Sequence, residues 1–458
     1  MARPIFSKMD GSFGRSARAF LCAAPRSDRV CTLFSRNRIA WINSLARQIR
    51  PAAWHVHQPR HLRQNPDQRS SSQCPAGHID PAMLASHPVG TQNNRCWALH
   101  GGRTMTKKRI AIVGAGAVGG YVGASLTAGG HDVTLIDPWA EHVNVLREHG
   151  MNLYGMTPEE RCTIPVNAMH LTEVQNLAKQ RPIDIAFISM KSYDTVWATR
   201  MIAQYLAPGG CVVSMQNCIN EEAVAGVVGW GRTLGCIVTG GVGVDLYEPG
   251  HIRRGYAKRP NVTSFYIGEP SGLITKRTQE IAEIMGCVDT SIATDNLWGE
   301  RWTKLCVNGM RNGVSAATGM GGNARDGHDA VRRVCIKLGG ESVRVGQALG
   351  YKLGKVGVLD PEQLALAMEG NAAAMDKIEA QLTASTADAT RSEYQRPSMG
   401  QDMAKGRRTE IEFMNGFIAR EGARAGIAAP THDMLTRQVL RVERGEIPAR
   451  PENVLVNS

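Results

Sequence analysis

Several patterns that would mark out a class of protein are missing from this sequence of 458 residues. Eleven cysteines are present, but none forms a C-x-x-C pair and none stands with histidine at metal-ligand spacing. We therefore expect reduced thiols and no metal site. No uninterrupted apolar run reaches about 18 residues, so we expect no membrane span. With no secretory pattern either, we expect a cytoplasmic protein.

Acidic residues are scarce in one part of the chain only. Residues 1–104 contain 14 Arg and one Lys but four Asp and no Glu, a net charge of +11, whereas the whole chain carries +12. The nearly neutral remainder gives no reason to expect a nucleic-acid partner.

The basic segment 1–104 has three possible interpretations. It resembles a transit peptide in composition, or it is a basic tail that binds nucleic acid. The third, which we favour, is upstream sequence translated from a start site set too early, because Met105 leads directly into the first predicted strand. In each case we expect a disordered basic extension, since little apolar surface is available to offset chain entropy.

A glycine-rich turn follows that strand. Arg109–Val113 is a short apolar run, the next six residues fit G-x-G-x-x-G, a helical pattern follows, and a second strand is predicted at 131–137. This strand–turn–helix context indicates a dinucleotide site, with the phosphates at the helix N-terminus. The predicted cofactor-binding residues of the turn are Gly114, Gly116, Ala117, Val118 and Gly119.

Asp137 ends the second predicted strand. A carboxylate there typically accepts hydrogen bonds from the adenosine ribose and repels a 2′-phosphate, which favours NAD over NADP. The alternative is that Asp137 only caps the turn at Pro138.

Further strands are predicted at 183–190, 211–215 and 234–238, with helices or loops between them. This rhythm predicts an α/β fold, a Rossmann doubly wound parallel sheet over 105–294, followed by an all-helical domain over 295–458. Lys191 and Asn217 follow two of the strands. Ligands bind at the carboxyl ends of such strands, so both are site candidates, although each could also be a solvated strand end.

In the helical half, Lys304, Asn308 and Asn312 are spaced four apart, which places them on one face of a helix. A surface helix could carry such a row without a role, but asparagine is a poor helix former and the apolar neighbours indicate burial. Downstream, Ser398 and Glu410 begin two helical segments. Plain helix capping is the alternative for both.

Taken together, these segments resemble the ketopantoate reductase (2-dehydropantoate 2-reductase) family, from about 110 to 435. The most specific pieces are the Lys304 row and the segment from Pro397 to Asn415. The resemblance implies that Lys304 is the general acid, that Glu410 orients it, and that Asn308, Asn312 and Ser398 hold the substrate. It places Lys191 and Asn217 at the junction of the cofactor and the substrate.

The resemblance implies NADPH-dependent reduction of the 2-oxo acid 2-dehydropantoate to (R)-pantoate, a step of pantothenate biosynthesis. Asp137 keeps NADH plausible as the cofactor. The alternatives are an NADH-preferring 2-oxo acid reductase, an (R)-2-hydroxy acid dehydrogenase of the mandelate type, or a non-catalytic dinucleotide sensor. A homodimer is possible.

Two departures from the family pattern concern the substrate end. Cys218 replaces the usual glycine after Gln-Asn and is expected near the nicotinamide. The stretch between Asn312 and Ser398 is also long, and it contains a Gly-rich run that ends at Arg325.

Overall fold

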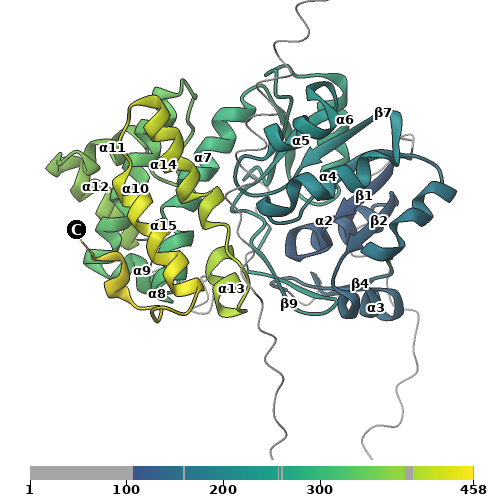
Figure 1. Ribbon diagram of the computed structural model, residues 1–458, viewed down its shortest axis with the longest axis horizontal. Helices are drawn as coiled ribbons and strands as arrows, with labels where there is room; N and C mark the ends of the chain where they lie inside the picture. Colours follow the sequence, from purple (N-terminus) through teal and green to yellow (C-terminus); the bar gives the residue numbers. More distant parts are fainter. Residues whose placement is uncertain are drawn as a thin grey trace, which may run out of the picture. The chain divides into compact units, whose positions relative to one another are not determined.

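An eight-stranded sheet, mainly parallel, organises the first half of the described chain (Figure 1). The computed structural model describes residues 107–456, apart from 158–159, 256, 259–260, 385 and 387–395, so the expected extension 1–104 lies outside the described residues. In spatial order the strands are β12 (Ser291–Thr294), β11 (Phe265–Gly268), β8 (Thr233–Val238), β7 (Leu206–Ser214), β6 (Ile183–Ile188), β1 (Arg109–Val113), β2 (Asp132–Asp137) and β5 (Asn167–His170). Only the β8–β11 pair is antiparallel.

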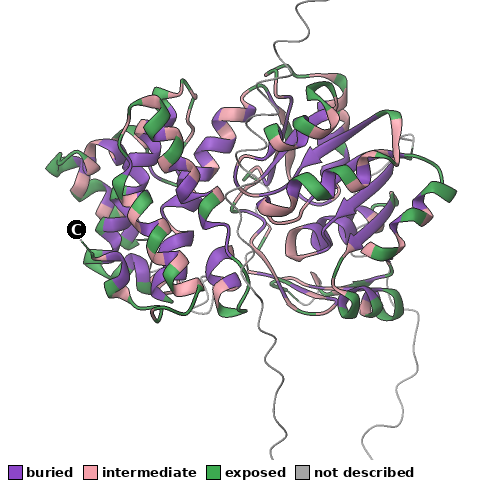
Figure 2. Ribbon diagram, viewed as in Figure 1, coloured by how far each residue is buried: buried purple, intermediate pink, exposed green. Residues whose placement is uncertain are grey.

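Helices cover both faces of this sheet, which explains why its strands are continuous apolar runs. In β1, Ile110 and Ile112 face one core, with α2 (Ala117–Ala128), α3 (Ala140–His149) and α6 (Lys276–Met285). Ala111 and Val113 face the other, with η3 (Leu171–Lys179), α4 (Thr195–Ala203) and α5 (Glu221–Val228). Figure 2 shows the central strands as buried. Each fully buried isoleucine contributes about 1.5–3 kcal/mol.

A second, four-stranded sheet was not foreseen from the sequence. Its order is β4 (Cys162–Ile164), β3 (Met151–Tyr154), β10 (His251–Arg254) and β9 (Val244–Glu248). The buried ring of His142 links this sheet to the glycine-rich turn, because its Nδ1 accepts the Gly250 N–H at 2.9 Å while its Nε2 lies 3.0 Å from the Ala115 carbonyl oxygen. Burial lowers the pKa of His142, so the ring is neutral and Nε2 is the donor.

From Leu297 onward the described elements are helical, and the expected Rossmann sheet followed by a helical domain is confirmed. The longest helix, α10 (Asp329–Ala348), contacts several of the others. The remaining helices are α7 (Leu297–Gly309), α8 (Asn312–Thr318), α9 (Gly322–Gly327), α11 (Pro361–Met368), α12 (Ala372–Ala384), α13 (Ser398–Ala404), α14 (Asn415–Ala425) and α15 (Pro430–Glu443), with the short 3-10 turns η7 (Ile411–Phe413) and η8 (Pro451–Val454).

The predicted row of polar residues does not lie on one uninterrupted helix. Helix α7 ends at Gly309, and Asn312 is the first residue of α8. The Arg311 N–H donates a hydrogen bond to the Asn308 carbonyl at 3.1 Å. This three-residue spacing makes the turn at the end of α7 tighter than an α-helical turn. The side-chain amide of Asn415 donates to the Gly309 carbonyl at 2.8 Å. This partner from α14 satisfies one of the carbonyls left open where the helix ends.

Arg301 anchors α7 to the sheet. Its Nε donates to the Glu221 carboxylate at 2.6 Å, and its two terminal nitrogens donate to the Gln216 and Ser214 carbonyls at 2.8 and 2.7 Å. Both side chains of the Arg301–Glu221 pair are fully buried. Because every edge of the guanidinium is satisfied, the start of α7 is fixed against the end of β7.

Replacing Arg301 by methionine should lower the free energy of unfolding by about 3–5 kcal/mol, because the Glu221 carboxylate would stay buried without its counter-charge. Urea unfolding of the full chain measures this. The matched control is Arg424→Met, which breaks an ion pair with Glu421 whose arginine is exposed and should change stability little. Equal urea midpoints for the two variants would show that Arg301 does not anchor α7 to the sheet.

Candidate active site

One cavity of about 1130 Å³ collects almost every residue singled out from the sequence. Its walls come from the carboxyl ends of β1, β2, β6 and β7 on one side and from α7, α8 and α13 on the other. The predicted residues that line it are Gly114, Gly116, Ala117, Val118, Asp137, Lys191, Asn217, Lys304, Asn308, Asn312, Ser398 and Glu410. Gly119 is the exception.

The glycine-rich turn is held by close packing beneath the cavity. Gly114 has φ +98°, and a Cβ on it would lie 2.9 Å from the Ser189 carbonyl oxygen. A Cβ on Gly119 would lie 1.9 Å from the Gly114 carbonyl oxygen, so Gly119 permits α2 to pack on the turn rather than lining the cavity. The open N-terminus of α2 at Gly116 therefore faces the cavity, where its unpaired N–H groups suit phosphate oxygens.

Asp137 accepts hydrogen bonds from two backbone N–H groups, one in the glycine-rich turn and one just after β2. One carboxylate oxygen accepts the Ala115 N–H at 2.8 Å, and the other accepts the Trp139 N–H at 2.9 Å. The side chain thus caps the turn after β2, and it also lines the cavity. Each oxygen retains a lone pair for a ribose hydroxyl.

Lys191 is the centre of an ion cluster that joins the sheet to the helices. Its Nζ contacts the Asp402 carboxylate and lies 3.5 Å from Glu410 Oε2. Burial acts to lower the pKa of Lys191, but the charges of Glu410 and Asp402 outweigh it, and the pKa is raised. The lysine is therefore a fixed cation at the end of β6.

Glu410 does not meet Lys304, contrary to the expectation from the resemblance. Its Oε1 accepts hydrogen bonds from the Ser192 backbone N–H at 2.9 Å and from the Ser192 hydroxyl at 2.8 Å. The segment before η7 brings Glu410 to the start of the turn after β6. There the carboxylate accepts hydrogen bonds from Ser192 and lies next to the Lys191 ammonium group. The expected pairing is wrong because long-range folding, not spacing, selects the partner of a carboxylate.

Lys304 is half-buried in the cavity wall without an acidic neighbour. Burial, together with the nearby charge of Arg311, lowers the pKa of Lys304 to about 8. No carboxylate within the described ranges counters these effects. The ammonium group is therefore poised near physiological pH rather than held charged by a partner.

Amide and hydroxyl groups line the same cavity as Lys304. The side-chain amide of Asn308 donates to the Asn217 side-chain oxygen at 3.2 Å, and that of Asn312 donates to the Ser398 hydroxyl at 3.3 Å. Ser398 is the first residue inside α13 and makes no capping hydrogen bond, and Glu410 makes none at η7. Plain capping therefore accounts for neither residue.

The structure places Cys218 directly after Asn217 and beside Ser192. It is not among the residues that line the cavity, and its side chain is buried in the core of the helical domain. Among the described non-glycine residues it alone has a positive φ, of 65°. The backbone needs this conformation to turn from β7 towards α5, which is where glycine would be the easier choice.

Sequence reasoning assigned no role to several charged residues of the cavity wall. Asp402 falls within the segment from Pro397 to Asn415 and had no predicted role of its own, yet its carboxylate is the closest partner of the Lys191 Nζ. Arg407 also lines the wall, with its guanidinium 5.8 Å from the centre of the Trp139 ring. Apart from standing close to Ser398 and Glu410 in the sequence, neither residue belongs to a local pattern that predicts a role. Each contacts a residue more than 200 positions away in the sequence.

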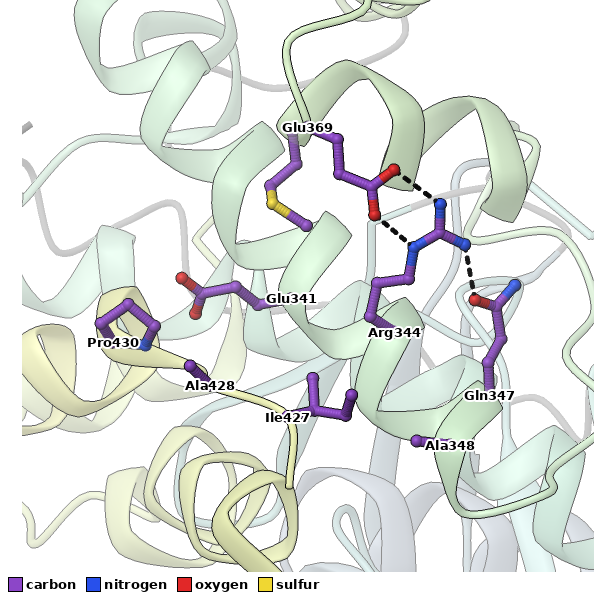
Figure 3. A pocket seen from close by; sticks show the side chains of 9 residues that line it. Glu341, Arg344, Gln347, Ala348, Glu369, Ile427, Ala428 and Pro430 are labelled. Carbon is purple, nitrogen blue, oxygen red and sulfur yellow. Dashed lines mark hydrogen bonds and ion pairs between the residues drawn. The ribbon is translucent and has the colours of Figure 1, made fainter. Parts of the chain in front are cut away.

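A second, smaller cavity of about 580 Å³ lies between α10, α11 and the start of α15 (Figure 3). Arg344 is bound there by Glu362 and Glu369. Glu341 accepts the Thr431 and His432 N–H groups and so caps α15. These charged groups all have partners within the protein, and we assign this smaller cavity a structural role.

Across the described part of the chain, no helix is long and apolar enough to cross a membrane. Over the same residues, no cluster of three or more His, Cys, Asp or Glu side chains is arranged to hold a metal ion.

Comparison with known proteins gives the family of this chain. Residues 110–265 match the family model described as ketopantoate reductase PanE/ApbA, and residues 296–443 match its C-terminal counterpart. The 2-dehydropantoate 2-reductase of Archaeoglobus fulgidus is 27% identical over 348 residues, covering 74% of this chain and 100% of the relative.

Two solved structures share the fold. A PanE/ApbA family ketopantoate reductase from Ralstonia eutropha superposes with a TM-score of 0.58 at 26% identity, covering 74% of this chain and 99% of its own. D-mandelate dehydrogenase with NADH and anilino(oxo)acetate has a TM-score of 0.60 at 22% identity, covering 74% and 98%. At that identity the second likeness shows the fold alone.

The fold and the cavity are those of an NAD(P)-dependent oxidoreductase that acts on a CH–OH group. More particularly, the chain belongs to the ketopantoate reductase family.

Gly119→Ala should abolish or strongly weaken binding of a nicotinamide dinucleotide, because the added methyl group would push α2 away from the turn that must hold the phosphates. Quenching of protein fluorescence by the cofactor measures the dissociation constant. Gly226→Ala in α5 is the matched control, since its Cβ would meet nothing within 4 Å. Unchanged binding by Gly119→Ala would show that the phosphates lie elsewhere.

Proposed function

We propose that this protein reduces 2-dehydropantoate to (R)-pantoate with a nicotinamide dinucleotide. The observation that carries the proposal is Lys304, an ammonium group of lowered pKa that shares one cavity with the phosphate-binding turn and a row of amide side chains. A 2-oxo acid brings a carbonyl to be protonated and a carboxylate to be held, and this set of groups suits both.

Lys304 is the proton donor in this proposal. A bound nicotinamide cofactor would supply hydride to the carbonyl carbon, and negative charge would then develop on the carbonyl oxygen. With a pKa of about 8, Lys304 is mostly protonated at pH 7 and still gives up its proton readily. The general-acid role thus requires no pairing with Glu410.

Asn217 follows β7 and Asn308 lies near the end of α7, and their side chains form a hydrogen bond with each other. Both are suited to orient the substrate. Asn312 and Ser398 are a second hydrogen-bonded pair that lines the same cavity. Glu410 is a positioning residue, which acts through Lys191 and Ser192 by fixing the turn after β6 against the helical half.

Reduction of a bulkier 2-oxo acid is the alternative from the same class. The helical wall of the cavity is mostly polar, with Asn308, Asn312, Ser398 and Gln401. An aromatic side chain would desolvate these groups without replacing their hydrogen bonds, which disfavours a mandelate-type substrate.

Lys304→Ala should lower kcat by about 10²–10⁴-fold, the usual contribution of general acid catalysis, and should leave the dissociation constant of the cofactor nearly unchanged. Steady-state kinetics with 2-dehydropantoate, alongside phenylglyoxylate, make the measurement. In the unsubstituted protein, kcat/KM for reduction should fall as the pH rises through about 8, because Lys304 must be protonated and its pKa is lowered.

The conservative variant Asn308→Asp provides a comparison that leaves Lys304 in place, and it should raise KM for the anionic substrate by repulsion. If Lys304→Ala keeps its turnover, or if kcat/KM of the unsubstituted protein stays level up to pH 10, Lys304 is not the general acid. Equal kcat/KM for phenylglyoxylate and 2-dehydropantoate would contradict the proposal that 2-dehydropantoate is the substrate.

We also propose NADPH as the preferred cofactor. Asp137 argues for NADH, but both of its oxygens already accept backbone N–H groups, which reduces their repulsion of a phosphate. The guanidinium of Arg407 lies over the Trp139 ring just beyond Asp137, and both Arg407 and Asp137 line the cavity. An arginine in this place is suited to bind a 2′-phosphate.

Arg407→Ala should raise the dissociation constant of NADPH about tenfold, the loss of one charge-assisted contact, while that of NADH stays the same. Titration of protein fluorescence with each cofactor gives both constants. The neighbouring Arg408→Ala, outside the cavity wall, is the control and should change neither. A parallel loss of both cofactors would contradict a specific role for Arg407.

A further inference from the structure

The buried ring of His142 contacts the middle of the glycine-rich turn. Its exposed fraction is 0%, and Nε2 lies 3.0 Å from the carbonyl oxygen of Ala115, the residue between Gly114 and Gly116. On the other side of the ring, Nδ1 accepts the Gly250 N–H at 2.9 Å. A backbone N–H can only donate and a carbonyl can only accept, so these two partners fix the tautomer with its proton on Nε2.

Ala115 is held on both sides by side chains from outside the turn. Its N–H donates to the Asp137 carboxylate at 2.8 Å, and its carbonyl accepts the hydrogen bond from His142. Ala115 is fully buried, and no other donor among the described residues bonds to that carbonyl. Removal of the His142 N–H would therefore leave a buried carbonyl without a partner, which costs more than an ordinary hydrogen bond contributes.

The orientation of the Ala115 carbonyl decides where the next N–H group points. The described peptide bonds include no cis bond, and in a trans peptide unit the C=O and N–H bonds point in opposite directions. The Gly116 N–H is thus directed away from His142. It makes no hydrogen bond within the described residues, Gly116 lines the cavity, and a Cβ on Gly116 would meet no atom within 4 Å. An open donor therefore lies beside open space at the start of α2, where a phosphate oxygen suits it.

The protein itself holds the ring of His142 in place. The Trp139 ring stacks on it, with the centroids 5.5 Å apart and the planes at 21°. The Trp139 N–H in turn donates to the Asp137 carboxylate at 2.9 Å, so the two side chains that hold Ala115 are linked to each other through Trp139. A turn that is fixed in this way loses little conformational freedom when it binds a ligand.

We propose that His142 is a positioning residue for the cofactor: by holding the Ala115 carbonyl, it orients the Gly116 N–H towards a phosphate of a bound nicotinamide dinucleotide. The proposal rests on the proposed function only in that this turn binds such a dinucleotide. The pyrophosphate is common to NADH and NADPH, so His142 should serve both cofactors equally. Arg407, by contrast, is proposed to act on the 2′-phosphate of NADPH alone.

Two substitutions separate the two hydrogen bonds of the ring. In His142→Gln the side-chain amide nitrogen can take the place of Nε2 and keep the bond to Ala115, whereas in His142→Asn the side-chain oxygen can take the place of Nδ1 and keep only the bond from Gly250. Fluorescence titration of the full chain should give dissociation constants for NADH and NADPH that both rise about tenfold in His142→Asn. In His142→Gln both constants should stay close to those of the unsubstituted protein.

Each variant loses one buried hydrogen bond, so urea unfolding should show similar losses of stability for the two. A merely structural role would then change cofactor affinity equally in both. His149→Asn is the matched control, because His149 ends the same helix with an exposed side chain, and it should change neither constant. With saturating cofactor, KM for 2-dehydropantoate in His142→Asn should equal that of the unsubstituted protein.

Equal dissociation constants for His142→Asn and His142→Gln, or a loss confined to NADPH, would overturn the proposal. If His142→Asn does not fold, His142→Leu, which removes both hydrogen bonds and keeps an apolar side chain in the core, is compared with His142→Gln in its place and should show the same weakening. Binding of the dinucleotides needs no turnover. Failure of 2-dehydropantoate as a substrate would therefore contradict the proposed function and leave these constants to decide the role of His142.

Discussion

The geometry of the active site depends on the buried Arg301–Glu221 pair. Helix α7 carries Lys304 and Asn308, whereas Asn217 lies at the end of β7. Arg301 donates to Glu221 and to two carbonyls at that strand end, so one side chain sets the distance between the helical and sheet walls. If the anchor were lost, Lys304 would no longer be held in a fixed position relative to the sheet.

A second set of charges also joins the sheet to the helices. Lys191, Asp402 and Glu410 join the turn after β6 to α13 and η7, and Glu410 also binds Ser192. The cofactor turn, the amide row and the ion cluster thus meet in one cavity. Fixed cations at its walls suit a dinucleotide and an anionic acid, while Lys304 is left to change protonation.

Much of the fold followed from local patterns. The apolar runs predicted the main parallel strands, because strands covered on both faces must be apolar throughout. The glycine spacing predicted the turn, since a Cβ on Gly114 or Gly119 would clash. The small sheet of β3, β4, β9 and β10 was missed, because short strands with mixed burial carry little periodicity.

By itself, the sequence determined which chemical groups the protein has and the order of its elements: the dinucleotide turn, the lysine with its asparagines, and the serine and glutamate downstream. Only the tertiary structure decided which of them meet. Glu410 pairs with Lys191 instead of Lys304, Asp137 binds two backbone N–H groups, and Cys218 packs into the core. The physical reason is that spacing along a chain fixes the partners within one helix or strand, whereas contacts between distant segments depend on how whole elements pack.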